Sequence, residues 1–335
     1  MRVLIFSDLH LHNHNYGSTM IDGVNSRLLD GANILDQVAA YCKENEVDRV
    51  VFGGDLFHTH GKIQAEVLKV AFEGFVKIKA QVPIVTALVG NHDTSDITMA
   101  THAMHWLKGL GVNVIDSPSR GDGFAYLPYV GTSEEVQMFF DKTSDGMICF
   151  LHQGLAGVPM KSGFVPGSEF SEDMIPDRVA HAFTGHYHPH RRVSEKATVI
   201  GSCMQLNWAD EGDERGFIIM DTTAPADFEF IPFNAPRFVT YNMGNALRVG
   251  RQNQGNIPGN FIRVKNYYNP NMEDIREEFM GVGAMSVEFV VEKEQGDRLR
   301  PVSSDELHIP DLIKAFEEGK DLSDERIKIG QELRT

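Results

Sequence analysis

Four short apolar runs alternate with longer segments of helical periodicity in the first half of the chain. The runs lie at residues 2–7, 49–52, 83–89 and 147–151. They are rich in β-branched and aliphatic residues, which is typical of buried strands. Apolar residues recur at three- and four-residue spacing over residues 28–42, 63–78 and 98–107. This spacing predicts amphipathic helices, and the alternation of strand and helix predicts an α/β fold built from βαβ units.

The pattern changes after residue 180, where apolar runs follow one another without long helices. These runs lie at residues 180–184, 198–200, 216–220 and 228–233. Because nothing between them has the length of a covering helix, we expect them to form a second sheet.

A smaller unit is predicted towards the C-terminus. A strand at 261–265, a helix at 272–280 and a strand at 285–291 follow a stretch rich in Gly, Asn and Gln. A charged linker then leads to two short amphipathic helices, at 311–318 and 323–333. We therefore expect a main domain over 1–235, a small βαβ domain over 236–295, and a linker with C-terminal helices over 296–335.

Composition narrows the classes of partner and compartment. The formal net charge of −16 argues against a broad basic surface that holds DNA unaided. No apolar stretch approaches the roughly 20 residues that a membrane span needs, and the N-terminal apolar run is too short for a signal peptide. Three cysteines lie far apart in apolar surroundings, so we expect a cytoplasmic protein without disulfides.

Candidate metal ligands follow the ends of the predicted strands. Asp8 and His10 end the first strand, where residues two apart share a face, and Asp55 follows a Gly-Gly turn after the second. The third strand ends in Gly-Asn91-His92-Asp93. A carboxylate on such a turn can bridge two cations, and Asp93 can hold the tautomer of the His92 ring.

Two further strands complete the series. His152 follows the fourth strand, and Gly-His186-Tyr-His188-Pro follows the fifth, with the proline favouring an extended backbone at His188. Imidazole and oxygen donors without thiolate suit a pair of Mn²⁺, Fe or Zn²⁺ ions better than a structural zinc. Paired metals imply in-line displacement at phosphorus.

The remaining histidines have a simpler explanation. A solvated or core-capping ring is expected for His12, His14, His60, His102, His105, His181 and His308. For His58 and His190, a structural role and a role in the site are both open, because each lies close to a predicted ligand. Arg191 and Arg192 could equally face solvent or contact phosphate.

These motifs resemble those of the calcineurin-like metallophosphoesterases over about residues 1–235. The segment Gly-Asp-Leu-Phe-His58 lacks the Asp-Arg of the protein phosphatases and is similar to that of the SbcD/Mre-eleven DNA repair nucleases. The stretch over 200–217 is most similar to the T-even phage form of that branch. The resemblance implies a two-sheet sandwich flanked by helices, with a small βαβ capping domain, and favours a phage or prophage origin.

Roles for individual residues follow from this resemblance. It implies one metal held by Asp8, His10, Asp55 and His188, and another held by Asp55, Asn91, His152 and His186. Asp55 would bridge the two ions, which are expected to be Mn²⁺. His92 corresponds to the family's proton donor, with Asp93 as its orienting partner.

The function expected from the resemblance is that of a Mn²⁺-dependent DNA exonuclease or endonuclease subunit in repair or recombination. A metal-bound hydroxide would attack the phosphorus, and His92 would protonate the leaving oxygen. The implied partners are DNA, an SbcC-type coiled-coil ATPase that the C-terminal helices could dock, and a second copy of the chain. The alternatives are a small-molecule phosphodiesterase or nucleotide phosphatase with the same core, and a scaffold without activity.

Overall fold

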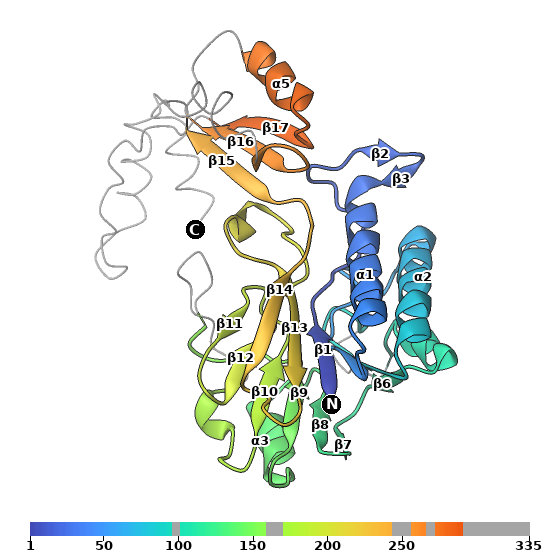
Figure 1. Ribbon diagram of the computed structural model, residues 1–335, viewed down its shortest axis with the longest axis vertical. Helices are drawn as coiled ribbons and strands as arrows, with labels where there is room; N and C mark the ends of the chain where they lie inside the picture. Colours follow the sequence, from blue (N-terminus) through green and yellow to red (C-terminus); the bar gives the residue numbers. More distant parts are fainter. Residues whose placement is uncertain (96–100, 159–169, 243–255, 266–271, 291–335) are drawn as a thin grey trace, which may run out of the picture. The chain divides into compact units, whose positions relative to one another are not determined.

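Two six-stranded sheets form the main part of the protein. The computed structural model describes residues 1–95, 101–158, 170–242, 256–265 and 272–290, all within one compact unit, Met1–Val290. The first sheet has the order β14-β13-β1-β4-β5-β6 (Figure 1). Its parallel strands are β1 (Arg2–Phe6), β4 (Arg49–Phe52), β5 (Ile84–Leu88) and β6 (Asn113–Ile115). Two antiparallel strands, β13 (Gly216–Asp221) and β14 (Phe228–Pro232), extend it beside β1.

The second sheet has the order β11-β12-β10-β9-β8-β7. Its parallel centre consists of β12 (Ala197–Val199), β10 (His181–Thr184), β9 (Ile148–Leu151) and β8 (Phe124–Leu127). The antiparallel edges are β11 (Arg191–Arg192) and β7 (Ser119–Gly121).

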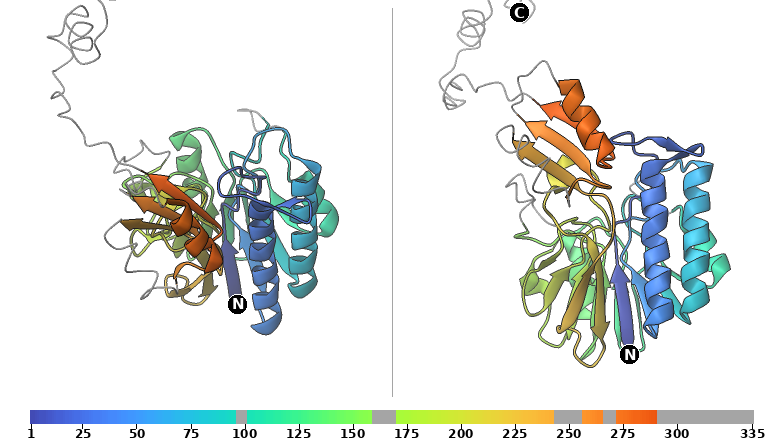
Figure 2. Two further views of the ribbon diagram at one scale, coloured as in Figure 1. Left: turned by 90° about the horizontal axis from the view of Figure 1, so that it is seen from above. Right: turned by 45° about the horizontal axis from the view of Figure 1, so that its top comes forward.

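Helices cover the outer faces of the sheets. Helices α1 (Ser26–Glu44) and α2 (Ala65–Gln81) lie side by side against the first sheet (Figures 1 and 2). Along β1, Leu4 and Phe6 face these helices, whereas Val3 and Ile5 face the core between the two sheets. Helix α3 (Ser133–Asp141) packs on the other face of the second sheet. The order of layers is therefore helix, sheet, sheet, helix, as expected for the predicted sandwich.

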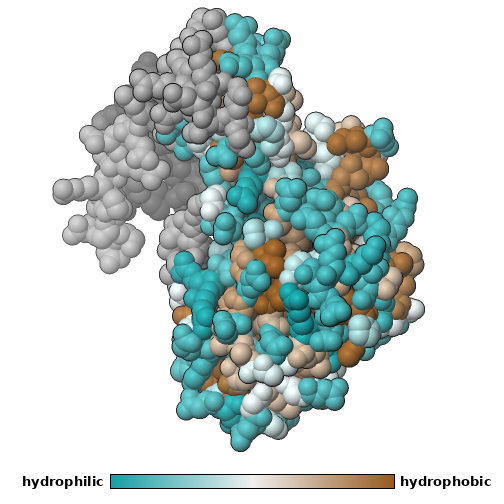
Figure 3. Space-filling model, in the orientation of Figure 1, coloured by the Kyte–Doolittle hydropathy of each residue, from teal (hydrophilic) through white to brown (hydrophobic). Residues whose placement is uncertain are grey.

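A local sequence signal explains where helix α1 begins. The Asn25 side chain caps α1 by accepting hydrogen bonds from the backbone N–H groups of Arg27 and Leu28, at 2.9 and 3.4 Å. Asn25 also ends the short hairpin of β2 (Met20–Ile21) and β3 (Val24–Asn25). Figure 3 shows the apolar surface of this hairpin, where Met20 is 67% exposed.

A third, three-stranded parallel sheet lies in the predicted small domain. It consists of β15 (Phe238–Asn242), β16 (Phe261–Lys265) and β17 (Ser286–Val290), with helix α5 (Met272–Gly281) between the last two strands. These elements have their own apolar core around Ile262, Val264 and Phe279, and we call them the capping unit. The domain boundaries themselves stay a prediction, and the predicted helices at 311–318 and 323–333 lie outside the described residues.

Two sequence-based expectations are wrong. Strands β13 and β14 do not join the second sheet, because β13 pairs antiparallel with β1 and so extends the first sheet. The strand at 147–151, expected beside the first ones, is β9 of the second sheet instead. A periodic apolar run indicates burial but not which of two stacked sheets receives the strand.

The prediction of a helix over 98–107 is also wrong for residues 101–107, the part that the structure describes. That part contains an isolated bridge between Thr94 and His102, and then the short 3₁₀ helix η1 (His105–Leu110). The His102 side chain accepts a hydrogen bond from the Met104 backbone N–H and thereby competes with helical pairing. Within the described residues, no helix has both the length and the apolar character needed to cross a membrane.

Candidate metal centre

The predicted ligands all lie in loops that leave the carboxyl ends of parallel strands. These strands are β1, β4 and β5 of the first sheet and β9 and β10 of the second. The two sheets are stacked, so the five loops meet at one end of the sandwich. The structure thus brings together side chains that are as far apart in the chain as Asp8 and His188.

Four of the predicted ligands have a left-handed backbone instead of an extended one. Strand β1 ends at Phe6, and Asp8 and His10 adopt left-handed conformations with φ of 53° and 49°. Asp55 and His186 do the same, with φ of 57° and 82°. Among the described residues, seven non-glycine residues have positive φ, and these four are among them. Such strain is maintained where the surroundings fix it, and it often marks functional sites.

The first cluster consists of Asp8, His10, Asp55 and His188. The Nε2 atoms of His10 and His188 lie 3.1 Å apart. His10 Nε2 is also 3.7 Å from an Asp55 oxygen and 4.0 Å from an Asp8 oxygen. All four donors therefore converge on one small volume in which Asp8, His10 and Asp55 are almost completely buried.

The second cluster shares Asp55 with the first. His152 Nε2 lies 3.3 Å from Asp55 Oδ2, the same oxygen that faces His10. The His186 ring contributes the third donor, and its Nδ1 lies 2.9 Å from Asn91 Oδ1. Asp55 is thus placed between two sets of donors.

The donor chemistry fits divalent cations. Two imidazole nitrogens that face each other across 3.1 Å repel each other through their lone pairs unless a proton or a cation lies between them. First-row metals bind nitrogen at roughly 2.1 Å, so two nitrogens on one ion come about 3 Å apart. The mixture of imidazole, carboxylate and amide donors suits Mn²⁺, Fe or Zn²⁺.

Glycines are required where the ligand loops approach one another. A Cβ at Gly54, which has φ of 109°, would come within 2.4 Å of His152 Nδ1. A Cβ at Gly90 would come within 2.1 Å of Asp55 Oδ1. The glycines of the Gly-Gly-Asp and Gly-Asn-His-Asp motifs are therefore needed for the loops that carry the predicted ligands to pack together.

Asp55 and His152 form an ion pair in this cluster, with a carboxylate facing a protonated imidazole. Burial alone would raise the Asp55 pKa, but the facing imidazoles, above all His152, hold this pKa well below its usual range. Burial would likewise lower the His152 pKa, yet the Asp55 carboxylate outweighs it and raises that pKa to about 10. In the absence of a cation the His152 ring is therefore protonated at neutral pH, and a cation bound at Nε2 would displace that proton.

The other ligands differ in protonation. Burial, together with the nearby Asp55 charge, raises the pKa of Asp8 to about 7. Burial lowers the pKa of His186 to about 3 and that of His188 to about 4, so both rings are neutral at pH 7. Of the predicted ligands, Asp8 and His152 would therefore have to lose protons to bind cations.

We expect Mn²⁺ binding to chelator-stripped protein to release protons and to tighten as the pH rises from 6 to 8. Asp8 holds its proton more tightly in the folded, metal-free protein than in the unfolded chain, where its pKa is 3.8. This proton stabilises the metal-free fold fully below pH 3.8, and the contribution is lost as the pH rises through about 7. A cation therefore competes with this proton less as the pH rises. Near pH 6, about two protons should leave, from Asp8 and His152. Calorimetry in two buffers of different ionisation enthalpy measures this number, and a pH-independent affinity would contradict the assignment.

Asp93 does not orient the His92 ring, so this prediction is wrong. Its carboxylate accepts hydrogen bonds from the backbone N–H groups of Asp55, Leu56, Phe57 and Gly90, at 2.9–3.1 Å. It thereby fixes the loop that carries Asp55. His92 Nδ1 instead lies 2.7 Å from the backbone carbonyl oxygen of His58, to which it can donate. A backbone carbonyl leaves no signal in the sequence.

Four histidines outside the predicted ligand set lie near the site. Both a structural role and a role in the site were open for His58, whereas His12, His14 and His60 were expected to be structural. The His58 and His60 rings stack on His92 with centroid separations of 5.8 and 4.7 Å. His58 also contacts the rings of His12 and His14. The short spacing of His10, His12 and His14 is the signal that could have indicated this grouping.

A separate group of His102, His105 and Asp116 is better explained without a metal. His102 Nδ1 accepts a hydrogen bond from the Met104 N–H, which leaves its Nε2 to donate towards Asp116 at 3.4 Å. Lys108 also binds Asp116, at 2.7 Å. A ring that is hydrogen-bonded in this way has no free lone pair for a cation.

More than half of the chain is similar to known proteins. The calcineurin-like phosphoesterase family profile matches residues 1–194. Putative phosphoesterase 244L of Invertebrate iridescent virus 6 is 24% identical over 221 residues, which cover 60% of this chain and 75% of that protein. Putative phosphoesterase 078R of Invertebrate iridescent virus 3 is 26% identical over 184 residues, covering 51% and 52%.

A nuclease subunit is also among the similar proteins. Exonuclease subunit 1 of Enterobacteria phage T4 is 28% identical over 249 residues, which cover 70% of this chain and 68% of that protein. A solved structure, the Pseudomonas putida nuclease MPE, is matched with a TM-score of 0.29 and 15% identity, covering 59% of this chain and 66% of that one. The similarity to calcineurin-like enzymes predicted from the motifs is thereby confirmed.

Proposed function

Because the chain belongs to the calcineurin-like phosphoesterase family, we propose that it is a Mn²⁺-dependent DNA nuclease subunit that acts in repair, recombination or end processing. The observation that carries this proposal is Asp55, whose carboxylate lies between the donors His10 and His152. The similarity to exonuclease subunit 1 of phage T4 supports a nucleic acid as the substrate, and DNA is the substrate that the motif resemblance implies.

The site residues have distinct roles in this proposal. Asp8, His10, Asp55 and His188 would hold one ion, and Asp55, Asn91, His152 and His186 the other. Two such ions supply an activated water at neutral pH and stabilise the charge that develops on the phosphate.

His92 would supply the proton for the leaving sugar oxygen. Its Nδ1–H can donate to the His58 carbonyl, which fixes the ring and leaves Nε2 for the proton transfer. Its backbone N–H donates to Asp55 Oδ1 at 2.9 Å, which keeps the ring next to the shared carboxylate. Proton donation and the metal ligands are thus linked by one short hydrogen-bonded loop.

Digestion of end-labelled DNA tests this proposal. Duplex and single-stranded substrates are incubated with Mn²⁺, Mg²⁺ or a chelator, beside bis-p-nitrophenyl phosphate and nucleoside monophosphates. The proposal predicts DNA cleavage that needs Mn²⁺ and stops with the chelator. Hydrolysis of the small substrates without DNA cleavage would favour the alternative, a small-molecule phosphodiesterase or nucleotide phosphatase.

An SbcC-type ATPase is the proposed partner of the C-terminal segment. The predicted helix at 311–318 has Leu312, Ile313 and Phe316 on one face. Deletion of residues 308–335 should abolish binding to such an ATPase while Mn²⁺-dependent cleavage of short DNA stays near the parent rate. Unchanged ATPase binding, or unfolding of the truncated protein, would contradict this assignment.

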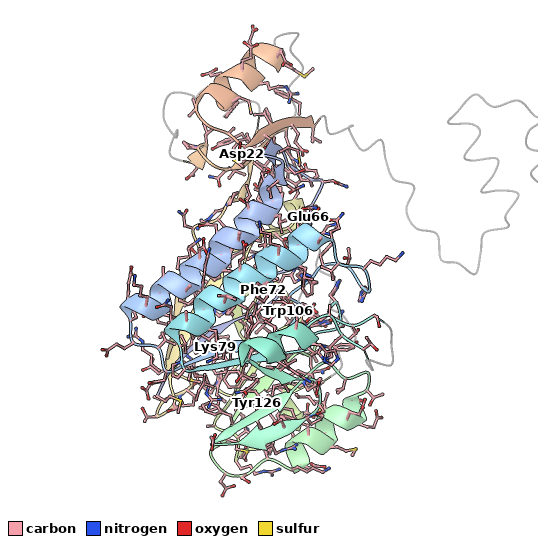
Figure 4. The ribbon with its side chains drawn as sticks, turned by 90° about the vertical axis from the view of Figure 1, so that its right-hand side faces the viewer. Asp22, Glu66, Phe72, Lys79, Trp106 and Tyr126 are labelled. Atoms are coloured by element: carbon pink, nitrogen blue, oxygen red, sulfur yellow. The ribbon has the colours of Figure 1, made fainter. Side chains whose placement is uncertain are left out.

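A second copy of the chain is the proposed partner of helix α2. Leu68, Phe72 and Val76 follow one another at four-residue spacing on the outer face of α2 and are 39%, 44% and 41% exposed. Figure 4 shows Phe72 on this face, beside Trp106, and their ring centroids lie 5.8 Å apart. An apolar stripe of this kind on a helix favours contact with another protein surface.

The charged residues beside the stripe already have partners within the chain. Lys69 lies 3.8 Å from Glu73 of the same helix, and Lys77 donates to Asp36 of α1 at 2.6 Å. The contact between two copies is therefore proposed for the apolar stripe alone. A two-fold axis through Phe72 would run two α2 helices antiparallel and place Leu68 opposite Val76 of the second copy.

Replacing Phe72 by Glu should weaken this dimer by about 100-fold or more, because a charge at the centre of an apolar interface removes a dominant contact. Sedimentation equilibrium measures the effect. Met138→Glu is the matched control, since Met138 is an equally large, 56% exposed side chain on α3. A parent protein that is monomeric at every concentration, or a Phe72→Glu dimer of parent affinity, would contradict the assignment.

A further inference from the structure

The segment over residues 205–215 contacts both the metal centre and the capping unit. It contains the short 3₁₀ helix η3 (Trp208–Asp210) and ends where β13 begins. We call it the linking loop. Neither its charged residues nor its contacts take part in the chemistry proposed above.

Arg215, at the end of the linking loop, contacts the backbone of His188, the proposed metal ligand, on the side away from its ring. Its guanidinium is almost completely buried, and Nη1 donates to the backbone carbonyl oxygen of His188. The backbone N–H of Ser202 donates to the same oxygen at 2.9 Å. On its other side, the His188 ring directs Nε2 towards His10 Nε2, 3.1 Å away. The His188 backbone is thus fixed by two donors while its ring faces the ligand cluster.

Two carboxylates of the linking loop hold the Arg215 guanidinium. Its Nη2 lies 2.8 Å from Asp210 Oδ1 and 3.3 Å from Asp213 Oδ2. The other Asp210 oxygen accepts hydrogen bonds from the backbone N–H groups of Leu206 and Asn207, at 2.8 and 3.3 Å. A buried guanidinium with such partners has little rotational freedom, so its position depends on the conformation of the loop.

The capping unit binds the opposite side of the same loop. The Phe238 backbone N–H in β15 donates to Gln205 Oε1 at 2.7 Å. The Thr240 backbone N–H and hydroxyl both donate to the Glu211 carboxylate. These contacts connect the first residues of β15 to the two ends of the η3 turn.

The geometry points to Arg215 as a positioning residue for His188, and to the linking loop as a mechanical connection between the capping unit and the metal centre. This inference rests on the proposed role of His188 as a metal ligand. A change in the contact between β15 and the loop shifts Asp210 and Arg215 together, and therefore the His188 backbone. Cation affinity then depends on whether the capping unit is docked, and by linkage cation binding favours the docked state.

Mn²⁺ titration of Arg215 variants tests the first half of the inference. Arg215→Gln should lower affinity at one of two Mn²⁺ sites by about 10- to 100-fold, the usual effect of losing a group that orients a ligand. Arg215→Lys keeps the positive charge but not the planar guanidinium group with its several donors, and its loss of Mn²⁺ affinity should be smaller than that of Arg215→Gln. Arg178→Gln is the matched control, because Arg178 also donates to backbone carbonyls, those of Phe140 and Thr143, away from the site.

A change in the capping unit tests the second half. Thr240→Val removes the hydroxyl donor to Glu211 with little change of shape, and it should lower Mn²⁺ affinity by about fivefold, the lower end of typical coupling. Thr223→Val is the control, since the Thr223 hydroxyl donates to the exposed Asp221 carboxylate at 2.6 Å. Calorimetry and the electron paramagnetic resonance spectrum of bound Mn²⁺ report the result without any DNA.

Parent affinity in both Arg215 variants would overturn the positioning role, and parent affinity in Thr240→Val would overturn the connection to the capping unit. If Arg215→Gln does not fold, Arg215→Lys tests the positioning role and Thr240→Val tests the connection to the capping unit. Because these experiments measure metal binding, failure of this inference can be distinguished from failure of the nuclease proposal. A parent that binds two Mn²⁺ ions but leaves DNA intact refutes only that function.

Discussion

Replacing Asp55 by Asn should abolish tight binding of both ions and lower DNA cleavage by about a thousandfold or more. The ions stabilise the transition state by several kcal/mol, and each roughly 1.4 kcal/mol is a factor of ten in rate. One carboxylate oxygen of Asp55 faces both His10 and His152, at 3.7 and 3.3 Å. A neutral amide cannot bridge two cations, so both sites should weaken together. Calorimetric Mn²⁺ titration and initial cleavage rates measure the two effects.

The fold should survive this substitution. Asp55 Oδ1 accepts a hydrogen bond from the His92 backbone N–H at 2.9 Å, and an asparagine oxygen can accept the same bond. Asp177→Asn, at an exposed carboxylate, is the control for loss of one charge. Retention of two bound Mn²⁺ ions and near-parent cleavage in Asp55→Asn would refute the bridging role.

Replacing His92 by Asn should keep the metals and lower the rate of DNA cleavage by about 10²- to 10⁴-fold, the usual contribution of general acid catalysis. The loss arises because an alkoxide leaving group needs a proton, whereas a nitrophenolate does not. The loss should therefore be much smaller for bis-p-nitrophenyl phosphate than for DNA. The ratio of these two rates, compared with the parent, is the measurement.

His105→Asn is the matched control for His92→Asn, because His105 lies on η1, outside the ligand clusters. An equal loss on both substrates would show that His92 does not act as a proton donor. Loss of a bound metal in His92→Asn would instead make His92 a ligand or a structural residue.

The elements of the fold were largely predictable, but their assembly was not. Runs such as 49–52 and 147–151 both indicate buried strands, and both are strands. Only pairing with β1 or with β10 decides which sheet each strand joins, and pairing depends on contacts distant in sequence. The sequence pattern does not predict strand β15 or helix α3, because a short amphipathic segment gives a weak periodic signal.

In the candidate site, too, the residues could be predicted from the sequence but parts of their arrangement could not. The positions of Asp8, Asp55 and His152 after strands could be predicted, because parallel strands bring their carboxyl ends to one edge. The left-handed backbone at Asp8 could not, since it follows from the close packing of five loops. Backbone partners are invisible in a sequence, so the acceptor of His92 and the amides bound by Asp93 became known only from the structure.

The anomalous scattering of Mn²⁺ in crystals of the full chain, collected at the manganese absorption edge, tests the central claim most directly. The account predicts two peaks per chain, one beside His10 and His188 and one beside His152 and His186, both within bonding distance of the Asp55 carboxylate. A single peak, or two peaks of which only one contacts Asp55, would contradict it.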